Sequence, residues 1–437
     1  MAGRQQAGSR RAAVLLIQRL AAEALAAVRD GRNLTEVLQA QRQRHADMDP
    51  RDRAAIIDIT HTALRHRGEL DFALRKLVSK PSNDARIQDL LMVGLCQLAY
   101  TRAAPYAVVD HAVKLAIQFN PGAKGFVNAV LRNFQRQQAS LLAEARRDES
   151  ARWNHPAWWQ AAMRNAYPAN WQNVLDANNT HPPMSLRVNT RKLTRDAYLA
   201  QLDAAGIRGA AEDSVGIRLE QAVPVDRLPG FFEGLCSVQD LGAQWAAPLL
   251  DVRDGMRVLD ACCAPGGKTG HLLEMADIDL TALDVDASRL TRVQDNLDRL
   301  GLRANLRAAD AAHPASWWDG PAFDRILADV PCSATGVARR HPDIKWLRRP
   351  EDFAQFATQQ ATMLDALWGC LKPGGTLLYA TCSVFPQENQ QQVAGFLQRQ
   401  SDARLQPLPD ALPPSGQLLP NDRHDGFYYA LLAKTLP

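Results

Sequence analysis

Residues 258–269 read Val-Leu-Asp-Ala-Cys-Cys-Ala-Pro-Gly-Gly-Lys-Thr, and this stretch decides the fold. It sets small residues and two glycines between an apolar segment typical of a buried strand and a segment typical of a helix. Small residues at such a turn let a ligand approach the backbone at the carboxyl end of a strand, where doubly wound sheets bind their ligands. The stretch therefore predicts a ligand-binding α/β domain.

Two phosphate-binding motifs are excluded by the same residues. Gly267-Lys268-Thr269 resembles the end of a P-loop, but a P-loop requires glycine where Cys262 stands. The G-x-G-x-x-G spacing of dinucleotide sites is also missing. The turn is therefore not expected to bind a nucleoside triphosphate or a dinucleotide.

The chain on either side of this turn predicts three domains, because 437 residues exceed what one hydrophobic core usually serves. Residues 1–140 show apolar positions at helical spacing and predict an all-α domain. Residues 151–250 mix a strand at 185–188 with a helix at 194–205 and predict a small α+β insert. Residues 251–437 alternate short apolar runs with helices, which predicts a Rossmann-like α/β domain with a parallel sheet covered on both faces. Its predicted strands are 257–262, 280–284, 304–308, 325–330 and 376–381.

Composition limits the possible functions only weakly. The formal net charge is +4, which fits a local nucleic-acid-binding surface but does not by itself indicate one. The seven cysteines form no C-x-x-C pair and no Cys/His zinc spacing, so we expect no disulfide framework, no metal and a reducing, cytoplasmic compartment. Arg19 and Glu23 interrupt the first apolar stretch too early for a membrane-spanning helix.

Small or acidic residues end three successive predicted strands. The first strand runs into the glycine-rich turn, Asp284 ends the second, and Asp310 closes the third. A carboxylate at the second position can accept hydrogen bonds from both ribose hydroxyls. Such carboxylates would repel a pyrophosphate but tolerate a sulfonium cation. The ordered set predicts S-adenosylmethionine as the cofactor.

Two cysteines lie where a parallel sheet presents its functional loops. Cys332 follows the fourth strand in Asp-Val-Pro-Cys, and Cys382 follows the fifth in Thr-Cys-Ser. Carbon 5 of cytosine becomes nucleophilic only when a thiolate adds at carbon 6, and a base must afterwards remove the carbon 5 proton. Asp329 is the candidate for the N3 and amino edge of the base, and Cys332 is the candidate for proton removal. Enzymes that methylate amino groups carry Asn or Asp followed by Pro-Pro and an aromatic at this position, so Asp-Val-Pro-Cys favours carbon methylation.

These motifs resemble those of the RNA cytosine-5 methyltransferases of the NOL1/NOP2/Sun type, and most closely the bacterial 16S ribosomal RNA enzymes of the Sun (Fmu) group. The resemblance covers nearly the whole chain and rests on residues 262–269, 329–346 and 379–383. Cys263 stands where alanine is usual in the family. Residues 105–132 are similar to a NusB-like helical RNA-binding domain, and Arg187-Val188-Asn189 resembles the segment between the two domains.

The resemblance implies a role for each motif. Cys382 would be the nucleophile, Cys332 would promote product release, and 16S ribosomal RNA, naked or in an early small-subunit particle, would be the partner. We expect no membrane association and a monomer. The methyl-donor pocket would be lined by Ala261, Cys262, Cys263, Ala264, Pro265, Gly266, Gly267, Lys268, Asp284, Asp310 and Asp329. The candidates for RNA phosphate contacts are Arg132, Arg136, Arg339, Arg340, Lys345, Arg348 and Arg349.

Two alternatives have distinguishing features. A DNA cytosine-5 methyltransferase also uses a Pro-Cys loop, but there that cysteine is the nucleophile and no Thr-Cys-Ser partner is expected. An RNA-binding factor with an inactive methyltransferase domain is disfavoured by the intact Cys382, Asp329 and glycine-rich turn. Titration with S-adenosylmethionine would separate this second alternative from an active enzyme.

Overall fold

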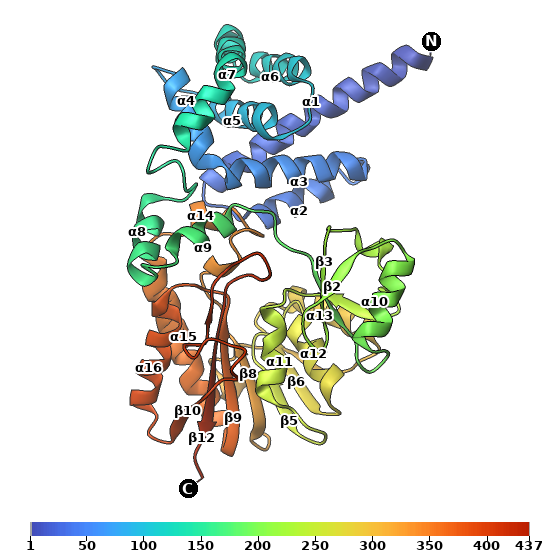
Figure 1. The fold of residues 1–437 in the computed structure, drawn as a ribbon, viewed down its shortest axis with the longest axis vertical. Coiled ribbons are helices and arrows are strands. Elements are labelled where there is room, and N and C mark those ends of the chain that lie inside the picture. Colours follow the sequence, from blue (N-terminus) through green and yellow to red (C-terminus); the bar gives the residue numbers. More distant parts are fainter. Residues whose placement is uncertain (1, 437) are drawn as a thin grey trace. The chain divides into compact units, whose positions relative to one another are not determined.

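A computed structural model describes the backbone of residues 2–436 and the side chains of residues 14–436. The chain forms two compact units. The first comprises Met1–Thr180 and Ala338–Arg348, and the second comprises His181–Val337 and Arg349–Pro437. Figure 1 shows the elements of both units.

The first unit is built from helices around one apolar core. Asn33 caps the second helix by accepting hydrogen bonds from the backbone N–H groups of Thr35 and Glu36. Pro50 and Pro105 begin helices at the position where a missing N–H is tolerated. The helices are α1 Ala2–Arg29, α2 Leu34–Arg44, α3 Pro50–Arg65, α4 Arg67–Leu77, α5 Ala85–Tyr100, α6 Pro105–Phe119, α7 Lys124–Ala145, α8 Ala157–Ala166, α9 Trp171–Asn178 and α14 Ile344–Leu347.

The segment Ala338–Arg348 joins this unit although it follows the predicted catalytic loop in the sequence. Trp346 packs against the helical core, and its indole N–H donates to the carbonyl of Leu64 at 2.8 Å. The carboxylate of Asp343 accepts a hydrogen bond from the backbone N–H of Leu34 at 2.9 Å. The segment is therefore an integral part of the helical unit.

The second unit contains a small antiparallel sheet in the order β2-β3-β1-β4. The central strand β1, Ser185–Val188, is buried along its whole length. Helix α10, Arg195–Ala204, begins at Thr194, whose hydroxyl accepts a hydrogen bond from the N–H of Ala197. The other strands are β2 Gly209–Ala211, β3 Gly216–Leu219 and β4 Cys236–Val238.

The larger sheet of this unit has the order β10-β12-β9-β8-β5-β6-β7, with β11 paired to β12. Strands β7, β6, β5, β8 and β9 pair in parallel, whereas β12 pairs antiparallel with both β9 and β10. The strands are β5 Arg257–Asp260, β6 Asp279–Asp284, β7 Asn305–Ala308, β8 Phe323–Asp329, β9 Leu371–Thr381, β10 Ala403–Gln406, β11 Gln417–Leu418 and β12 Phe427–Lys434. The strand order reverses direction between β5 and β8, and ligands of doubly wound sheets bind at such a switch point.

Helices cover both faces of this sheet, and each face has its own apolar core (Figure 1). Alternate residues of one strand serve opposite faces, so Leu377 and Tyr379 join one core while Leu378 and Ala380 join the other. One face carries α15 Asp352–Cys370 and α16 Gln390–Arg399. The other carries α11 Ala246–Leu250, α12 Gly267–Met275 and α13 Ala287–Leu300.

The predicted fold class is confirmed: an all-α N-terminal part, a small α+β insert and a C-terminal Rossmann-like α/β domain. One expectation is wrong, because the large sheet is mixed rather than purely parallel. Strand β12 reads Phe-Tyr-Tyr-Ala-Leu-Leu-Ala-Lys, and an uninterrupted apolar run of this length cannot be distinguished from a buried helix by periodicity. The boundaries of the three predicted domains stay predictions, and residues 151–180 group with the helical unit.

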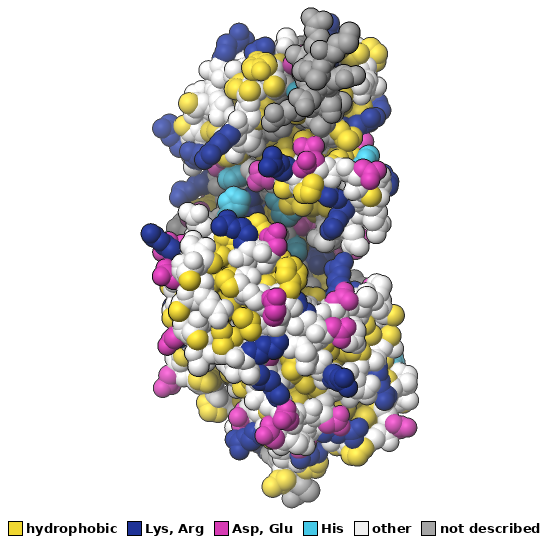
Figure 2. Space-filling model, turned by 90° about the vertical axis from the view of Figure 1, so that its right-hand side faces the viewer, with side chains coloured by type: hydrophobic (Ala, Val, Ile, Leu, Met, Phe, Trp, Pro, Cys, Tyr) yellow, Lys and Arg dark blue, Asp and Glu magenta, His cyan; other side chains and the backbone are white. Residues whose placement is uncertain are grey.

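Charged side chains of both signs lie on the one face of the molecule that Figure 2 shows. On the face shown in Figure 2, Lys and Arg side chains are scattered among acidic and apolar ones. This distribution agrees with the small net charge of +4.

Candidate active site

The glycine-rich turn joins β5 to α12 through residues 261–266. Gly266 has φ +95°, a left-handed conformation that side chains with a Cβ rarely adopt. A Cβ at this position would also lie 3.1 Å from the side chain of Val293 on α13. The backbone N–H of Gly266 donates to the carbonyl of Cys263 at 2.7 Å, which closes the turn. Glycine is thus required here both by the backbone conformation and by the packing of α13.

Asp284 stands at the end of β6 and is buried, with 3% of its surface exposed. Its carboxylate accepts hydrogen bonds from the N–H groups of Ala264, at 3.3 Å, and Asp286, at 3.0 Å. Arg289 on α13 forms an ion pair with it at 3.3 Å. The end of β6 is therefore bonded directly to the glycine-rich turn.

Asp310 lies two residues beyond the end of β7 rather than on the strand itself. Its side chain is 46% exposed, and its Oδ2 lies 3.0 Å from Nδ1 of His313. The carboxylate also accepts a hydrogen bond from the N–H of Ala312 at 2.9 Å. Asp310 is therefore more accessible to a ligand than the buried Asp284.

Lys268 and Asp329 form an ion pair between the first turn of α12 and the end of β8, with Nζ and Oδ2 2.6 Å apart. Burial by itself lowers the pKa of Lys268, but the charge of Asp329 and its hydrogen bond outweigh burial and raise that pKa above its ordinary value. Lys268 therefore stays positively charged. The pair joins the helix that follows β5 to the end of β8, and these are the two strands at the switch point of the sheet.

Cys332 and Cys382 are brought together by the pairing of β8 with β9. Asp329 is in register with Ala380, so the loops that follow the two strands emerge side by side. The two sulfur atoms are 3.4 Å apart, and both residues are half-buried. The hydrogen bond with Cys382, followed by burial, raises the pKa of the Cys332 thiol well above its ordinary value. The arrangement places a protonated thiol beside a second sulfur atom.

Three family profiles match successive parts of the chain. The profile of the NusB family matches residues 8–136, the RsmF/B-like ferredoxin-like domain matches residues 155–226, and the 16S rRNA methyltransferase RsmB/F profile matches residues 247–433. The ribosomal RNA small subunit methyltransferase B of Salmonella paratyphi C is 46% identical over 426 residues, 96% of this chain and 98% of that protein. The chain belongs to the RsmB/F family of 16S rRNA methyltransferases. The corresponding protein of Salmonella typhi has the same identity and coverage.

Solved structures share the fold of this RsmB/F-family chain. The crystal structure of PH0851 has a TM-score of 0.76 at 22% identity and covers 95% of this chain and 99% of that one. A methyltransferase homologue from Pyrococcus horikoshii has a TM-score of 0.57 at 28% identity, with coverage of 65% and 96%. NSun6 from the same organism, with SFG, has a TM-score of 0.58 at 18% identity, with coverage of 64% of this chain and 99% of that one.

Among residues 2–436, no helix is both long and apolar enough to cross a bilayer.

For two of the basic residues in this RsmB/F-family chain, the predicted contact with RNA phosphates is wrong. Arg339 and Lys345 are buried in the helical unit and cannot reach a phosphate. The Lys345 ammonium donates to the carbonyl of Arg65 at 3.0 Å and to the side-chain oxygen of Asn179 at 2.9 Å. Burial, and then the charge of Arg65, lowers the pKa of Lys345 well below its ordinary value.

The other predicted basic residues stay candidates for phosphate contact. Arg132 and Arg136 are exposed on α7, and Arg349 is exposed just before α15. Arg340 and Arg348 are half-buried. Sequence reasoning could not separate these residues from the buried ones, because charge alone does not reveal burial.

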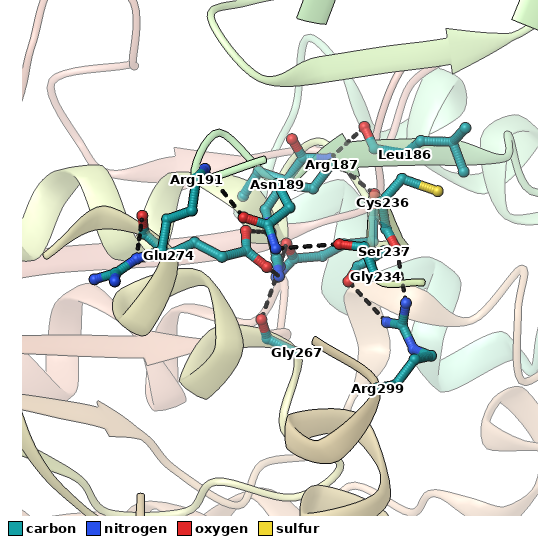
Figure 3. Close-up of polar contacts among 12 residues, drawn as sticks. Leu186, Arg187, Asn189, Arg191, Gly234, Cys236, Ser237, Gly267, Glu274 and Arg299 are labelled. Carbon is teal, nitrogen blue, oxygen red and sulfur yellow. Dashed lines mark hydrogen bonds and ion pairs between the residues drawn. The ribbon is translucent and has the colours of Figure 1, made fainter. Parts of the chain in front are cut away.

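A buried ion pair that the sequence did not predict supports the glycine-rich turn (Figure 3). Arg187 on β1 bonds both carboxylate oxygens of Glu274 on α12 at 2.8 Å. The same guanidinium donates to the carbonyl of Gly267 at 2.8 Å. The family resemblance singled out Arg187 without giving it a role. The structure shows that it ties the small sheet to the helix that begins at the turn.

Glu388 is a second residue that the sequence analysis missed. It ends a short 3-10 helix, η6 Pro386–Glu388, and is fully buried beside both cysteine loops. The only sequence signal is its position six residues after Cys382. A lone glutamate in a loop is ordinarily exposed, so nothing in the sequence distinguished it.

Proposed function

We propose that the chain transfers a methyl group from S-adenosylmethionine to carbon 5 of a cytosine in 16S rRNA through a covalent bond between Cys382 and the cytosine. The observation that carries this proposal is the 3.4 Å separation of the Cys332 and Cys382 sulfur atoms, on loops that follow neighbouring parallel strands. Two thiols in contact can divide nucleophilic attack and proton removal between them. The carboxylate of Asp329 ends one of these strands.

The residues around the glycine-rich turn fit the proposed methyl donor. Gly266 allows the left-handed turn at the switch point, and Asp284 ends the adjacent strand as a ribose-binding carboxylate would. The residues predicted to bind the methyl donor are 261–268, Asp284, Asp310 and Asp329. Three of them are carboxylates at or just beyond strand ends, and their negative charge suits a cationic sulfonium. S-adenosylmethionine, when bound, supplies an electrophilic methyl carbon.

Cys382 and Asp329 act first in the proposed reaction. The Cys382 thiolate forms a bond to carbon 6 of the cytosine, and the electrons of the ring double bond become available at carbon 5. We assign Asp329 to the N3 and amino edge of the base. Lys268 bonds Oδ2 of this carboxylate at 2.6 Å and so fixes its orientation. Carbon 5 then accepts the methyl group while the base stays attached to Cys382.

Cys332 acts second. Its pKa is raised chiefly by its contact with Cys382, and the charge of Cys382 adds to this effect. Once Cys382 is bonded to carbon, its sulfur carries no charge, so the ionisation of Cys332 becomes easier and its proton passes to water. The Cys332 thiolate removes the carbon 5 proton. The ring double bond re-forms as the bond between carbon 6 and Cys382 breaks, which restores the Cys382 thiolate.

The proposed setting follows from the family. We propose a cytoplasmic location and a 16S rRNA substrate, either naked or in an early small-subunit particle. Exposed arginines of the helical unit, such as Arg132 and Arg136, would hold the RNA through its phosphates.

Mapping 5-methylcytosine across 16S rRNA tests the proposed function. Bisulfite sequencing of rRNA from cells with and without the protein should reveal one cytosine that is modified only when the protein is present. Complementation with Cys382→Ala should leave that cytosine unmodified. A methyl group found instead on a ring nitrogen, an exocyclic amine or a ribose would refute the proposal.

A further inference from the structure

The carboxylate of Glu388 lies between the two cysteine loops and binds both of them. Oε1 accepts hydrogen bonds from the backbone N–H of Ser333 at 2.8 Å and from Nε2 of Gln360 at 3.1 Å. Oε2 accepts hydrogen bonds from the hydroxyl groups of Ser333 and Ser383, each at 2.5 Å. Both serines and Glu388 are fully buried.

Each of these serines is the immediate neighbour of a cysteine. Ser333 follows Cys332, and Ser383 follows Cys382. The carboxylate therefore connects the two residues whose positions decide where the sulfur atoms lie. The backbone also joins the loops, since the N–H of Gly336 donates to the carbonyl of Cys382 at 2.8 Å. That bond fixes the backbone, whereas Glu388 fixes the buried side chains beneath the two thiols.

The position of Glu388 does not depend on its carboxylate alone. The hydroxyl of Tyr379 on β9 donates to the backbone carbonyl of Glu388 at 2.7 Å. The amide of Gln360 on α15 also donates to the carbonyl of Pro331, directly before Cys332, at 2.9 Å. The surrounding residues thus hold η6 in place, so a change confined to the Glu388 side chain leaves its backbone anchored.

The charge of Glu388 affects the two cysteines through a separate physical effect. The four groups that donate to the carboxylate are neutral, namely one backbone amide, one side-chain amide and two hydroxyls. After the contact with Cys382, burial and the charge of Cys382, the charge of Glu388 also raises the pKa of Cys332. A buried negative charge disfavours a thiolate beside it, so it favours the protonated form of Cys332 before attack.

We propose that Glu388 is a positioning residue that holds the Cys332 and Cys382 loops in reactive contact and reserves the nucleophilic role for Cys382. The assignment of roles rests on the proposed cytosine-5 mechanism. The positioning rests on the hydrogen bonds of one carboxylate to Ser333 and Ser383. A displacement of the loops by about 1 Å can reduce the rate of a reaction by about 10²-fold.

Three variants of the full-length protein test this role. Glu388→Gln keeps the volume and removes the charge. Glu388→Asp keeps the charge but shortens the side chain, so it cannot reach both serines without strain. Asp402→Asn is the matched control, because this carboxylate accepts a hydrogen bond from the indole of Trp368 at 2.9 Å and contacts neither cysteine loop.

Methylation kinetics provide the first measurement. For Glu388→Gln and Glu388→Asp we expect kcat to fall by about 10- to 10²-fold. KM for RNA and the affinity for S-adenosylmethionine should stay within about twofold of wild type, because the residues around Gly266 are unchanged. Asp402→Asn should retain wild-type kcat.

Alkylation of the two cysteines provides the second measurement and needs no RNA. Iodoacetamide labelling from about pH 6 to about pH 9, resolved by mass spectrometry, reports the thiolate fraction of each cysteine. The titratable groups that interact with Cys332 are Cys382, Tyr379 and Glu388. In Glu388→Gln the labelling of Cys332 should begin at a lower pH than in wild type, whereas Glu388→Asp should retain the wild-type profile.

The results separate a failure of this inference from a failure of the proposed function. Wild-type kcat and a wild-type labelling profile in Glu388→Gln would overturn the positioning role. A fall in thermal stability and in S-adenosylmethionine affinity equal to the fall in kcat would also overturn it, because that result indicates general damage. Full methylation by Cys382→Ala would refute the proposed mechanism, while the labelling result for Glu388→Gln would still hold or fail by itself.

Discussion

Replacement of Cys332 by alanine should trap the enzyme on its RNA. The Cys332→Ala variant keeps Cys382, Asp329 and Lys268, so attack and methyl transfer should proceed. The variant lacks the thiol that lies 3.4 Å from the Cys382 sulfur, which we assign to removal of the carbon 5 proton. Methylated RNA should then remain joined to Cys382.

The loss of a general base sets the size of this effect. Loss of a positioned general base slows a proton transfer by about 10²- to 10⁴-fold, which corresponds to about 2.7 to 5.4 kcal/mol in the barrier. For a median turnover of about 10 s⁻¹, release would fall to between about 10⁻¹ and about 10⁻³ s⁻¹. The adduct would persist for about ten seconds to about twenty minutes, long enough to survive a denaturing quench.

A denaturing gel with radiolabelled RNA detects the adduct. Cys332→Ala should give a shifted protein–RNA band that carries the methyl group, and wild type should give little. The double variant Cys332→Ala with Cys382→Ala should give no band, which shows that the bond involves Cys382. If Cys382→Ala traps RNA and Cys332→Ala does not, the roles of the two cysteines are reversed. If both single variants methylate at the wild-type rate, covalent catalysis by this pair is refuted.

Four further changes have defined outcomes. Asp284→Ala should weaken S-adenosylmethionine binding by more than about 1 kcal/mol in calorimetry, because a hydrogen bond to a charged group is lost; unchanged affinity would remove Asp284 from the site. Burial raises the pKa of Asp260 to about 7, whereas the pKa of this carboxyl group in the unfolded chain is near 4. The protonated carboxyl group therefore stabilises the fold fully below about pH 4, and the free energy of unfolding should fall by about 4 kcal/mol as the pH rises from about 4 to about 7. Urea unfolding of Asp260→Asn should lack this loss, and a pH profile like that of wild type would contradict the raised pKa. Arg187→Met leaves Glu274 buried without its partner and should lower the free energy of unfolding by about 3 to 5 kcal/mol, whereas Arg187→Met combined with Glu274→Leu should recover most of it; equal losses in both variants would exclude the ion pair as the cause. Arg132→Ala should reduce the slope of log affinity for RNA against log salt by about 1, and an unchanged slope would mean that this exposed arginine contacts no phosphate.

The sequence by itself determined the elements that depend on local patterns. The glycine-rich turn at residues 261–266, the strands before it and after it, and the positions of Asp284, Asp329, Cys332 and Cys382 at or just beyond strand ends all follow from runs of about ten residues. Parallel strands present their carboxyl ends at one edge of a sheet, so local patterns also indicated that the two cysteines would meet. The all-α N-terminal part was predictable for the same reason, because helical periodicity is a local property.

Only the tertiary structure decided which polar residues are buried and what they bind. Arg339 and Lys345 read as RNA-binding residues, yet both bond to Arg65 in the helical unit, 274 and 280 positions earlier in the chain. The partners of Glu388 include Ser333, 55 positions away, and Arg187 meets Glu274 across 87 positions. Periodicity and local motifs contain no information about such separations. A buried charge is stable only where distant segments supply its hydrogen bonds, so the folded chain alone specifies these residues.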